Sequence, residues 1–113
     1  MKIAVIGSRT MMISDLKPYL PEGVTEIVSG GAKGIDTCAR EYALANNLKL
    51  TEFLPEYDLY KRAAPLKRNI QIIDYSDQVI AFWDGKSRGT KFVIDKCRKK
   101  GKPLTVFMEN ELP

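Results

Sequence analysis

The chain has 113 residues and a mass of 12.7 kDa, a length that accommodates one domain with its own hydrophobic core. Hydrophobic residues make up 44% of the sequence and charged residues 28%, which is ordinary globular composition and excludes a disordered chain. The net charge is +4, and the absence of histidine excludes His-based triads, His-ligated metals and imidazole acid–base catalysis.

The first half of the chain alternates short apolar runs with helical patterns. A strand is expected at Ile3–Ile6, followed by a short, weak helix around Ser14–Leu20 that proline interrupts. A second strand at Glu26–Ser29 leads into a helix from about Gly34 to Asn46. A third strand, Lys49–Leu54, ends at a proline.

The second half begins with Glu56–Pro65, which we interpret as an irregular loop. A helix is expected at Leu66–Tyr75, followed by a continuously apolar strand, Gln78–Phe82, that is typical of burial on both faces. A helix at Gly89–Lys100 ends at a glycine, and a last strand covers Pro103–Phe107.

This alternation favours βαβ units and a doubly wound α/β domain with a parallel sheet. The side chains expected on the inward helix faces are Ile35, Cys38, Ala39, Tyr42 and Ala43, then Leu66, Ile70 and Ile73, then Val93, Ile94 and Cys97. Both cysteines are therefore expected to be buried free thiols. No leader and no run of membrane-spanning length is apparent, so we expect a cytoplasmic protein without a membrane partner.

Three polar, glycine-rich turns follow strands in this arrangement. They are Gly7-Ser8-Arg9-Thr10, the segment Ser29–Asp36 and the segment Asp84–Thr90. In open parallel sheets, ligands bind outside the carboxyl ends of the strands, where the strand order reverses. We therefore expect the three turns to form one ligand site.

The turn between the second strand and its helix has the features of an anion site. Glycines permit close approach of the backbone, and the start of a helix offers free N–H groups and the positive end of its dipole. The candidate residues here are Ser29, Gly30, Gly31, Lys33, Gly34 and Asp36. The alternative is that the glycines only shape a turn and that Asp36 only caps the helix.

The turn after the fourth strand repeats this design. Its candidate residues are Asp84, Gly85, Ser87, Gly89 and Thr90. The alternative is a glycine-rich connection with Ser87 as a helix N-cap.

Three further residues, Arg9, Arg68 and Asn69, are candidates, and Trp83 lies next to the last turn. Arg9 has the planar fork that suits phosphate oxygens, although a lone arginine in a turn is also an ordinary surface residue. Arg68 and Asn69 lie beside the apolar stripe of the third long helix, where an amide is unusual for a purely structural position. Trp83 either stacks on a base or packs at a strand end.

Several familiar motifs are absent. The sequence has no G-x-x-x-x-G-K-[ST] segment, which excludes a P-loop ATPase, and no G-x-G-x-x-G after the first strand, which weakens the case for an ordinary NAD dehydrogenase. No cluster of metal-ligating carboxylates stands out, and the sequence identifies no cofactor.

The series I-x-G-S-R, V-S-G-G-A-K-G-I-D, R-N and A-F-W-D-G-K-S-R-G-T resembles the SLOG superfamily. That group includes the DNA-processing protein A (DprA/Smf) proteins and the Lonely Guy phosphoribohydrolases, and the likeness is closest to its small, single-domain, YpsA-related members. The resemblance covers nearly the whole chain. It implies a Rossmann-like, doubly wound sheet of about five mainly parallel strands in three αβα layers, and a pocket for a nucleotide or a nucleotide-derived ligand.

By position, the resemblance implicates Gly7, Ser8, Arg9, Ser29, Gly30, Gly31, Gly34, Asp36, Arg68, Asn69, Asp84, Gly85, Ser87, Gly89 and Thr90. The Lonely Guy motif resembles P-G-G-x-G-T-x-x-E, but Val93 stands at the glutamate position here. DprA-like proteins act on single-stranded DNA with further regions, and relatives commonly pair, which implies self-association.

Three functions follow, in order of preference. The first is binding of a nucleotide or nucleotide-derived phosphate ligand, for example as a sensor, and the second is cleavage of an N-glycosidic or phosphate bond with Asp36 or Asp84 as the carboxylate. The third is binding of single-stranded nucleic acid through a basic run. That run consists of Lys91, Lys96, Arg98, Lys99, Lys100 and Lys102.

Overall fold

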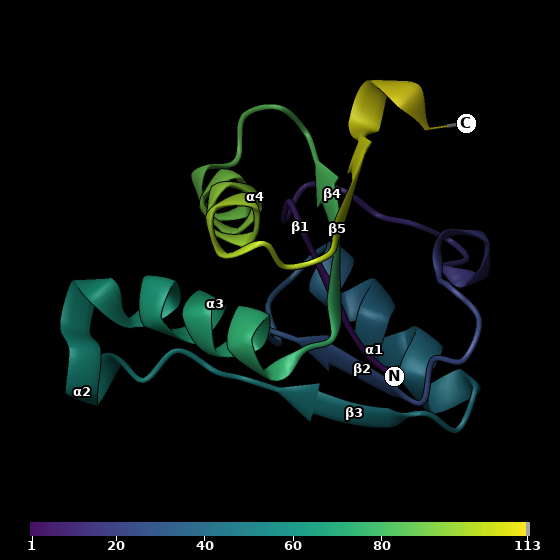
Figure 1. Cartoon of the computed structure of the whole chain (residues 1–113), viewed down its shortest axis with the longest axis horizontal. Helices are drawn as coiled ribbons and strands as arrows, with labels where there is room; N and C mark the ends of the chain where they lie inside the picture. The colour runs from purple at the N-terminus through teal and green to yellow at the C-terminus, as the bar shows by residue number, and fades with distance from the viewer. Residues whose placement is uncertain (113) are drawn as a thin grey trace.

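The computed structural model describes residues 1–112, which form a parallel five-stranded sheet with helices on both faces (Figure 1). The strands are β1 (Lys2–Gly7), β2 (Glu26–Ser29), β3 (Lys49–Glu52), β4 (Gln78–Trp83) and β5 (Leu104–Met108). The helices are α1 (Ile35–Ala45), the short α2 (Tyr57–Tyr60), α3 (Ala64–Tyr75) and α4 (Arg88–Lys100). Single 3₁₀ turns lie at η1 (Lys17–Tyr19), η2 (Lys61–Ala63) and η3 (Glu109–Glu111).

The strand order is β3-β2-β1-β4-β5, and every neighbouring pair is parallel. The chain therefore runs outward from β1 to β3 on one side and returns to the centre with β4. The order reverses between β1 and β4, which is where a doubly wound fold opens a crevice at the carboxyl ends of its strands. The predicted Rossmann-like α/β fold is confirmed.

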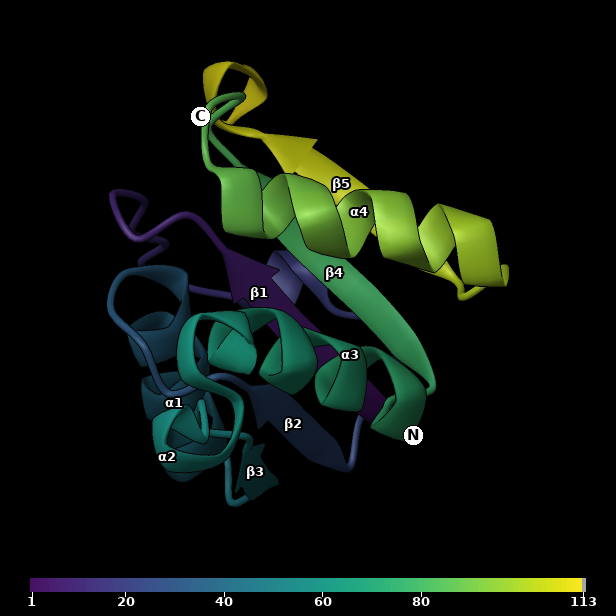
Figure 2. The ribbon, with the colours of Figure 1, turned by 90° about the vertical axis from the view of Figure 1, so that its left-hand side faces the viewer.

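Two hydrophobic clusters lie on opposite faces of the sheet, because side chains alternate along each strand. Ile3 and Val5 of β1 pack with α1 and the η1 segment, whereas Ala4 and Ile6 pack with α3 and α4. Figure 2 shows α3 and α4 side by side over one face. Each of these two helices forms one wall of the crevice at the carboxyl edge of the sheet.

The structure contradicts the expected secondary structure of two segments. Residues 14–20 form no helix beyond the single 3₁₀ turn η1, because Pro18 would lie in the interior of a helix that began at Ser14, where its ring clashes and it lacks an N–H. Residues 56–65 are not an irregular loop but hold α2, η2 and the start of α3. Pro65 lies in the first turn of α3, where its missing N–H is not needed.

The inward face of α3 also differs from the expectation. Leu66 is 43% exposed, and the buried residues of the helix are Ala64, Arg68, Ile72 and Ile73. An arginine occupies the middle of this stripe, so apolar spacing alone could not identify it. The other inward faces agree with the prediction: Cys38 and Cys97 are buried and unpaired by any disulfide within the described residues.

Candidate functional site

A pocket of about 380 Å³ lies at the carboxyl edge of the sheet, between α3 and α4. Its rim is formed by the β1–η1 turn, the β2–α1 turn and the β4–α4 turn, which are the three turns that the sequence singled out. Ten of the sixteen candidate residues line it: Gly7, Arg9, Gly30, Asp36, Arg68, Asn69, Asp84, Ser87, Gly89 and Thr90. The structure therefore brings segments far apart in the sequence to one concave site.

The floor of the pocket is apolar. Ile6 from β1, Ile72 from α3 and Val93 from α4 are buried side chains that also line the cavity, and Pro65 completes the α3 side. Apolar walls with a few placed polar groups are typical of small-molecule sites. Val93 stands at the position of the Lonely Guy glutamate, so the cavity has an aliphatic side chain there.

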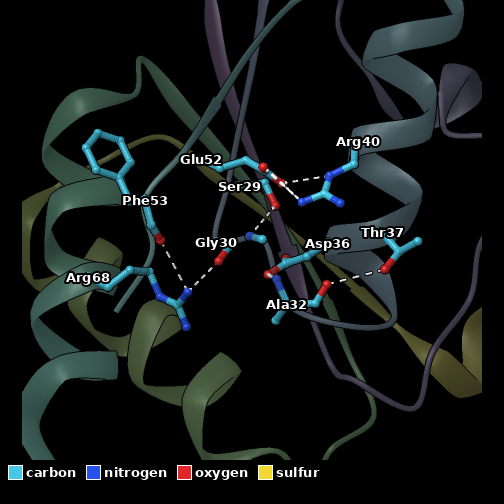
Figure 3. Close-up of polar contacts among 10 residues, drawn as sticks. Ser29, Gly30, Ala32, Asp36, Thr37, Arg40, Glu52, Phe53 and Arg68 are labelled. Carbon is cyan, nitrogen blue, oxygen red and sulfur yellow. Dashed lines mark hydrogen bonds and ion pairs between the residues drawn. The ribbon is translucent and has the colours of Figure 1, made fainter. Parts of the chain in front are cut away.

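One end of the pocket is built around Arg68 and the β2–α1 turn (Figure 3). Arg68 Nη1 donates to the carbonyl oxygens of Gly30 at 2.7 Å and Phe53 at 3.3 Å, and its Nε donates to Asn69 Oδ1 at 2.9 Å. The guanidinium, which belongs to α3, thereby fastens two loops that follow neighbouring strands. Its Nη2 has no hydrogen-bond partner within residues 1–112.

Asp36 lies on the other side of Gly30 and is 8% exposed. Its Oδ2 accepts the N–H of Ala32 at 3.0 Å, so the carboxylate folds back onto the turn that precedes α1. Burial raises the pKa of Asp36, and the hydrogen bond from Ala32 and the nearby charge of Arg68 oppose that rise. Burial likewise lowers the pKa of Arg68, against the attraction of Asp36.

The opposite end of the pocket is the β4–α4 turn, which Asp84 organises. Its Oδ1 accepts the N–H groups of Lys86 and Ser87, both at 2.8 Å, and its Oδ2 accepts the hydroxyl of Thr10 at 3.4 Å. These backbone hydrogen bonds, that from Ser87 first, lower the pKa of Asp84. Ser87 then caps α4 by accepting the N–H of Thr90.

Glycines at the site have two different roles. A Cβ on Gly34 would lie 2.5 Å from the carbonyl oxygen of Arg9, and a Cβ on Gly7 would lie 2.7 Å from that of Phe82, so the fold itself requires both glycines. A Cβ on Gly89 would meet no heavy atom of the described chain within 4 Å, although the residue lines the pocket. Internal packing therefore does not explain the glycine at position 89.

Six candidates do not line the pocket. Ser8 is buried and accepts the N–H of Asp84, and Ser29 is buried and accepts the N–H of Gly31, so both hydroxyls stabilise turns. Lys33 is exposed outside the cavity. The other three are Gly31, Gly34 and Gly85, each of which has a positive φ angle.

The sequence did not predict the lining residues Ile6, Pro65, Ile72 and Val93 in the site, whereas Thr10 and Ala32 lie in predicted turns without being singled out. Most are apolar, and only the crossing of α3 and α4 over the sheet brings them together. Trp83 does not line the cavity; its indole N–H donates to the carbonyl of Ser87, which is the packing alternative.

Two features are absent from the described part of the chain. Residues 1–112 contain no group of three or more His, Cys, Asp or Glu side chains placed to hold a metal ion. Within the same residues, no helix has both the length and the apolar character needed to cross a membrane.

Comparisons with known proteins agree with this architecture. The family model described as DNA recombination-mediator protein A matches residues 1–56. The X-ray structure of DNA processing protein A (DprA) from Streptococcus pneumoniae matches with a TM-score of 0.69 and 25% sequence identity. The match covers 93% of this chain and 49% of that chain, so the chain spans about half the length of that relative. No curated protein matches significantly.

The topology and the structural match define a Rossmann-like α/β protein. Within that class, the chain is related to DprA and is of the SLOG type, as the sequence motifs indicated.

Proposed function

We propose that the pocket binds a nucleotide or a nucleotide-derived phosphate ligand, with its phosphate at the start of α4. The observation that carries this proposal is Gly89, an exposed glycine in the first turn of α4 that lines the pocket and has open space at its Cβ position. Free N–H groups and the positive end of the helix dipole favour an anion there. A glycine lets a phosphate approach the backbone closely.

The remaining walls suit the rest of such a ligand. The apolar floor of Ile6, Ile72 and Val93 offers a surface for a sugar or a base, and the Arg68 end offers polar groups. Arg9 is exposed on the rim, where its guanidinium can reach a phosphate. The charge of Asp84 is offset by hydrogen bonds to both of its oxygens.

Calorimetric titration with AMP, ADP-ribose, cyclic nucleotides and ribose 5-phosphate tests the proposal. We expect at least one of them to bind, and we expect Arg9→Ala to weaken that binding on the order of tenfold, the loss of one charge-assisted contact. Arg62→Ala is the matched control, because Arg62 is exposed and lies outside the pocket. If no phosphate compound of the panel binds, the proposal is wrong. Chromatography of the mixtures shows whether a bound nucleotide is also cleaved.

The relation to DprA supports a second candidate function, the binding of single-stranded nucleic acid. The matching family is named for DNA recombination, and the matching structure is named for DNA processing. The basic run on and after α4 is the candidate surface, but Lys91 pairs with Asp95, Lys100 pairs with Asp74, and Lys102 donates to the carbonyl of Ser76. Lys96, Arg98 and Lys99 remain for phosphate contacts.

The salt dependence of oligonucleotide binding tests this second candidate function. With about three phosphate contacts, the logarithm of the affinity for a single-stranded oligonucleotide should fall with a slope near −2 against the logarithm of salt concentration. The triple variant with Lys96, Arg98 and Lys99 changed to glutamine should lose this binding and keep nucleotide binding. An oligonucleotide affinity that this variant leaves unchanged would rule out the basic run as the contact surface.

A further inference from the structure

The two ends of the pocket differ in what they can hydrogen-bond. The α4 end presents backbone N–H groups at Gly89 beside Asp84, whose two oxygens already accept three hydrogen bonds from the protein. The other end presents a carboxylate, Asp36, next to the guanidinium of Arg68 and the amide of Asn69. The two carboxylates therefore differ: Asp84 accepts three hydrogen bonds from the protein, whereas Asp36 accepts the N–H of Ala32 and has more capacity left for donors of a ligand.

Asp36 retains unused acceptor capacity. An ionised carboxylate has about four acceptor positions. The protein supplies the N–H of Ala32 at 3.0 Å, and the Ser29 hydroxyl lies close enough to favour the charged form. The residue is 8% exposed and lines the cavity, so a ligand in the pocket would lie beside its carboxylate.

Arg68 and Asn69 contribute donors beside this acceptor. Within residues 1–112, no fully buried side-chain nitrogen or oxygen lacks a partner, so the unpaired Nη2 of Arg68 keeps accessible surface, and the residue lines the cavity. Asn69 Oδ1 accepts from Arg68 Nε, which leaves the amide hydrogens of Asn69 available. All three side chains are held by the protein before any ligand arrives.

A phosphate cannot satisfy the free carboxylate oxygen, because both groups are acceptors at neutral pH. The ligand must bring O–H or N–H donors to this end. Vicinal ribose hydroxyls fit best, since each hydroxyl donates one hydrogen bond to the carboxylate and accepts one from a neighbouring donor such as Arg68 or Asn69. Asp36 also follows β2, the strand next to β1, from which carboxylates in doubly wound nucleotide-binding folds reach ribose hydroxyls.

We propose that Asp36, supported by Arg68 and Asn69, binds the hydroxyls of a ribose, so that the pocket selects ribonucleotides over deoxyribonucleotides. This inference rests on the proposed function and specifies its ligand class. It assigns Asp36 to recognition and involves no bond cleavage.

The test compares AMP with 2′-deoxy-AMP, 3′-deoxy-AMP and IMP by calorimetric titration of the whole chain. Loss of a hydrogen bond to a charged group should weaken at least one deoxynucleotide on the order of tenfold to a hundredfold, whereas IMP, which lacks the exocyclic amine, should bind like AMP. Asp36→Asn should reduce the preference for AMP over the deoxynucleotide. Asp95→Asn, on the exposed face of α4, should preserve it.

Each other outcome overturns a specific statement. Equal binding of AMP and both deoxynucleotides would overturn the ribose assignment and leave the proposed function intact. Weak binding of IMP with normal binding of the deoxynucleotides would assign the carboxylate to a base amine instead. Binding of none of the four compounds or of the other phosphate ligands would overturn both proposals. If Asp36→Asn does not fold, the wild-type comparison still decides.

Discussion

Gly89 is exposed in the first turn of α4, where glycine is a less favourable helix residue than alanine. Gly89→Ala should therefore keep the free energy of unfolding or raise it by up to about 1 kcal/mol. The added methyl group would occupy the space that we assign to a phosphate, so binding of the nucleotide should weaken by roughly tenfold or more. Urea unfolding and calorimetry measure the two effects.

Gly101→Ala is the control for this substitution. Gly101 ends α4 with a φ of 70°, a left-handed conformation that disfavours a Cβ, so the variant should lose about 1 kcal/mol of stability. It lies outside the pocket, and nucleotide binding should not change. Unaltered nucleotide affinity in Gly89→Ala would contradict a phosphate at this helix start.

Asp36 should cost stability at neutral pH, because burial raises its pKa in the folded state. A carboxyl group with a raised folded pKa stabilises the fold below its unfolded pKa and loses that contribution as pH rises through the folded value. Asp36→Asn keeps an oxygen for the N–H of Ala32 and removes the buried charge. The melting temperature of this variant at pH 7 should equal or exceed that of the wild type, and the difference should shrink in acid.

Asp95→Asn again serves as the control, with a change in stability of at most about 0.5 kcal/mol at an exposed position. A clear loss of stability in Asp36→Asn at pH 7 would show that the carboxylate is chiefly a structural group. At this scale the sequence placed Asp36 at a helix start but could not reveal its fold-back to Ala32, because that contact depends on the path of the turn.

The helix α3 is connected to the sheet edge by Arg68. Arg68→Met keeps the aliphatic stem but removes the donors to the carbonyl oxygens of Gly30 and Phe53. A buried carbonyl without a partner costs about 1–3 kcal/mol, so the variant should be destabilised by about 2 kcal/mol or more. Arg62→Met, at an exposed position of η2, should stay within about 0.5 kcal/mol of the wild type. Equal unfolding curves for the two variants would contradict the structural role of Arg68.

Elements with clear periodicity could be predicted from the sequence, and those without it could not. The strands and the helices α1 and α4 lie within a few residues of their expected bounds, because apolar runs and terminal glycines mark them. The segment that contains α2 and η2 has no buried residue, so no hydrophobic pattern identifies it as helical. In α3 the buried residue in the middle of the inward face is Arg68, so apolar spacing in the sequence assigned Leu66 to that face in its place.

At the scale of the whole molecule, acid should weaken the fold through Glu26. Burial raises the pKa of this carboxyl. Hydrogen bonds from Tyr75 and Thr51 and the charges of Lys49 and Lys2 lower the pKa, and together they outweigh burial, so the net pKa is lowered. A lowered folded pKa gives stability that is present above the ordinary value of 4.5 and is lost as pH falls through the folded value.

Unfolding experiments at pH 7 and pH 3 should therefore show a smaller pH effect in Glu26→Gln than in the wild type. Glu26 on β2 accepts hydrogen bonds from Thr51 on β3 and from Tyr75 on α3, so its protonation weakens contacts among three elements. Glu41→Gln, an exposed substitution on α1, should reproduce the wild-type pH profile. A pH effect of the same size in both variants would place the acid sensitivity elsewhere.

The position of the candidate site was the most predictable property of the whole molecule. Polar turns after parallel strands predict a shared edge, and the reversal between β1 and β4 sets the crevice there. The sequence could not predict which turn residues line the pocket and which stabilise the turns. Ser8, Ser29 and Gly34 resemble ligand contacts in sequence, but they stabilise or permit the backbone conformation of the turns.

The central place of β1 has a consequence for how the protein is made. Among the strands of the sheet, β1 is synthesised before the others, but β4, which pairs with its other side, comes late: the N–H of Lys2 donates to the side chain of Asp77, 75 residues further on. Until β4 emerges, a nascent chain presents β1 with an unpaired edge and a mainly apolar sequence, which is a template for unwanted pairing. Synthesis of this chain therefore has a vulnerable interval, during which chaperone protection would matter most.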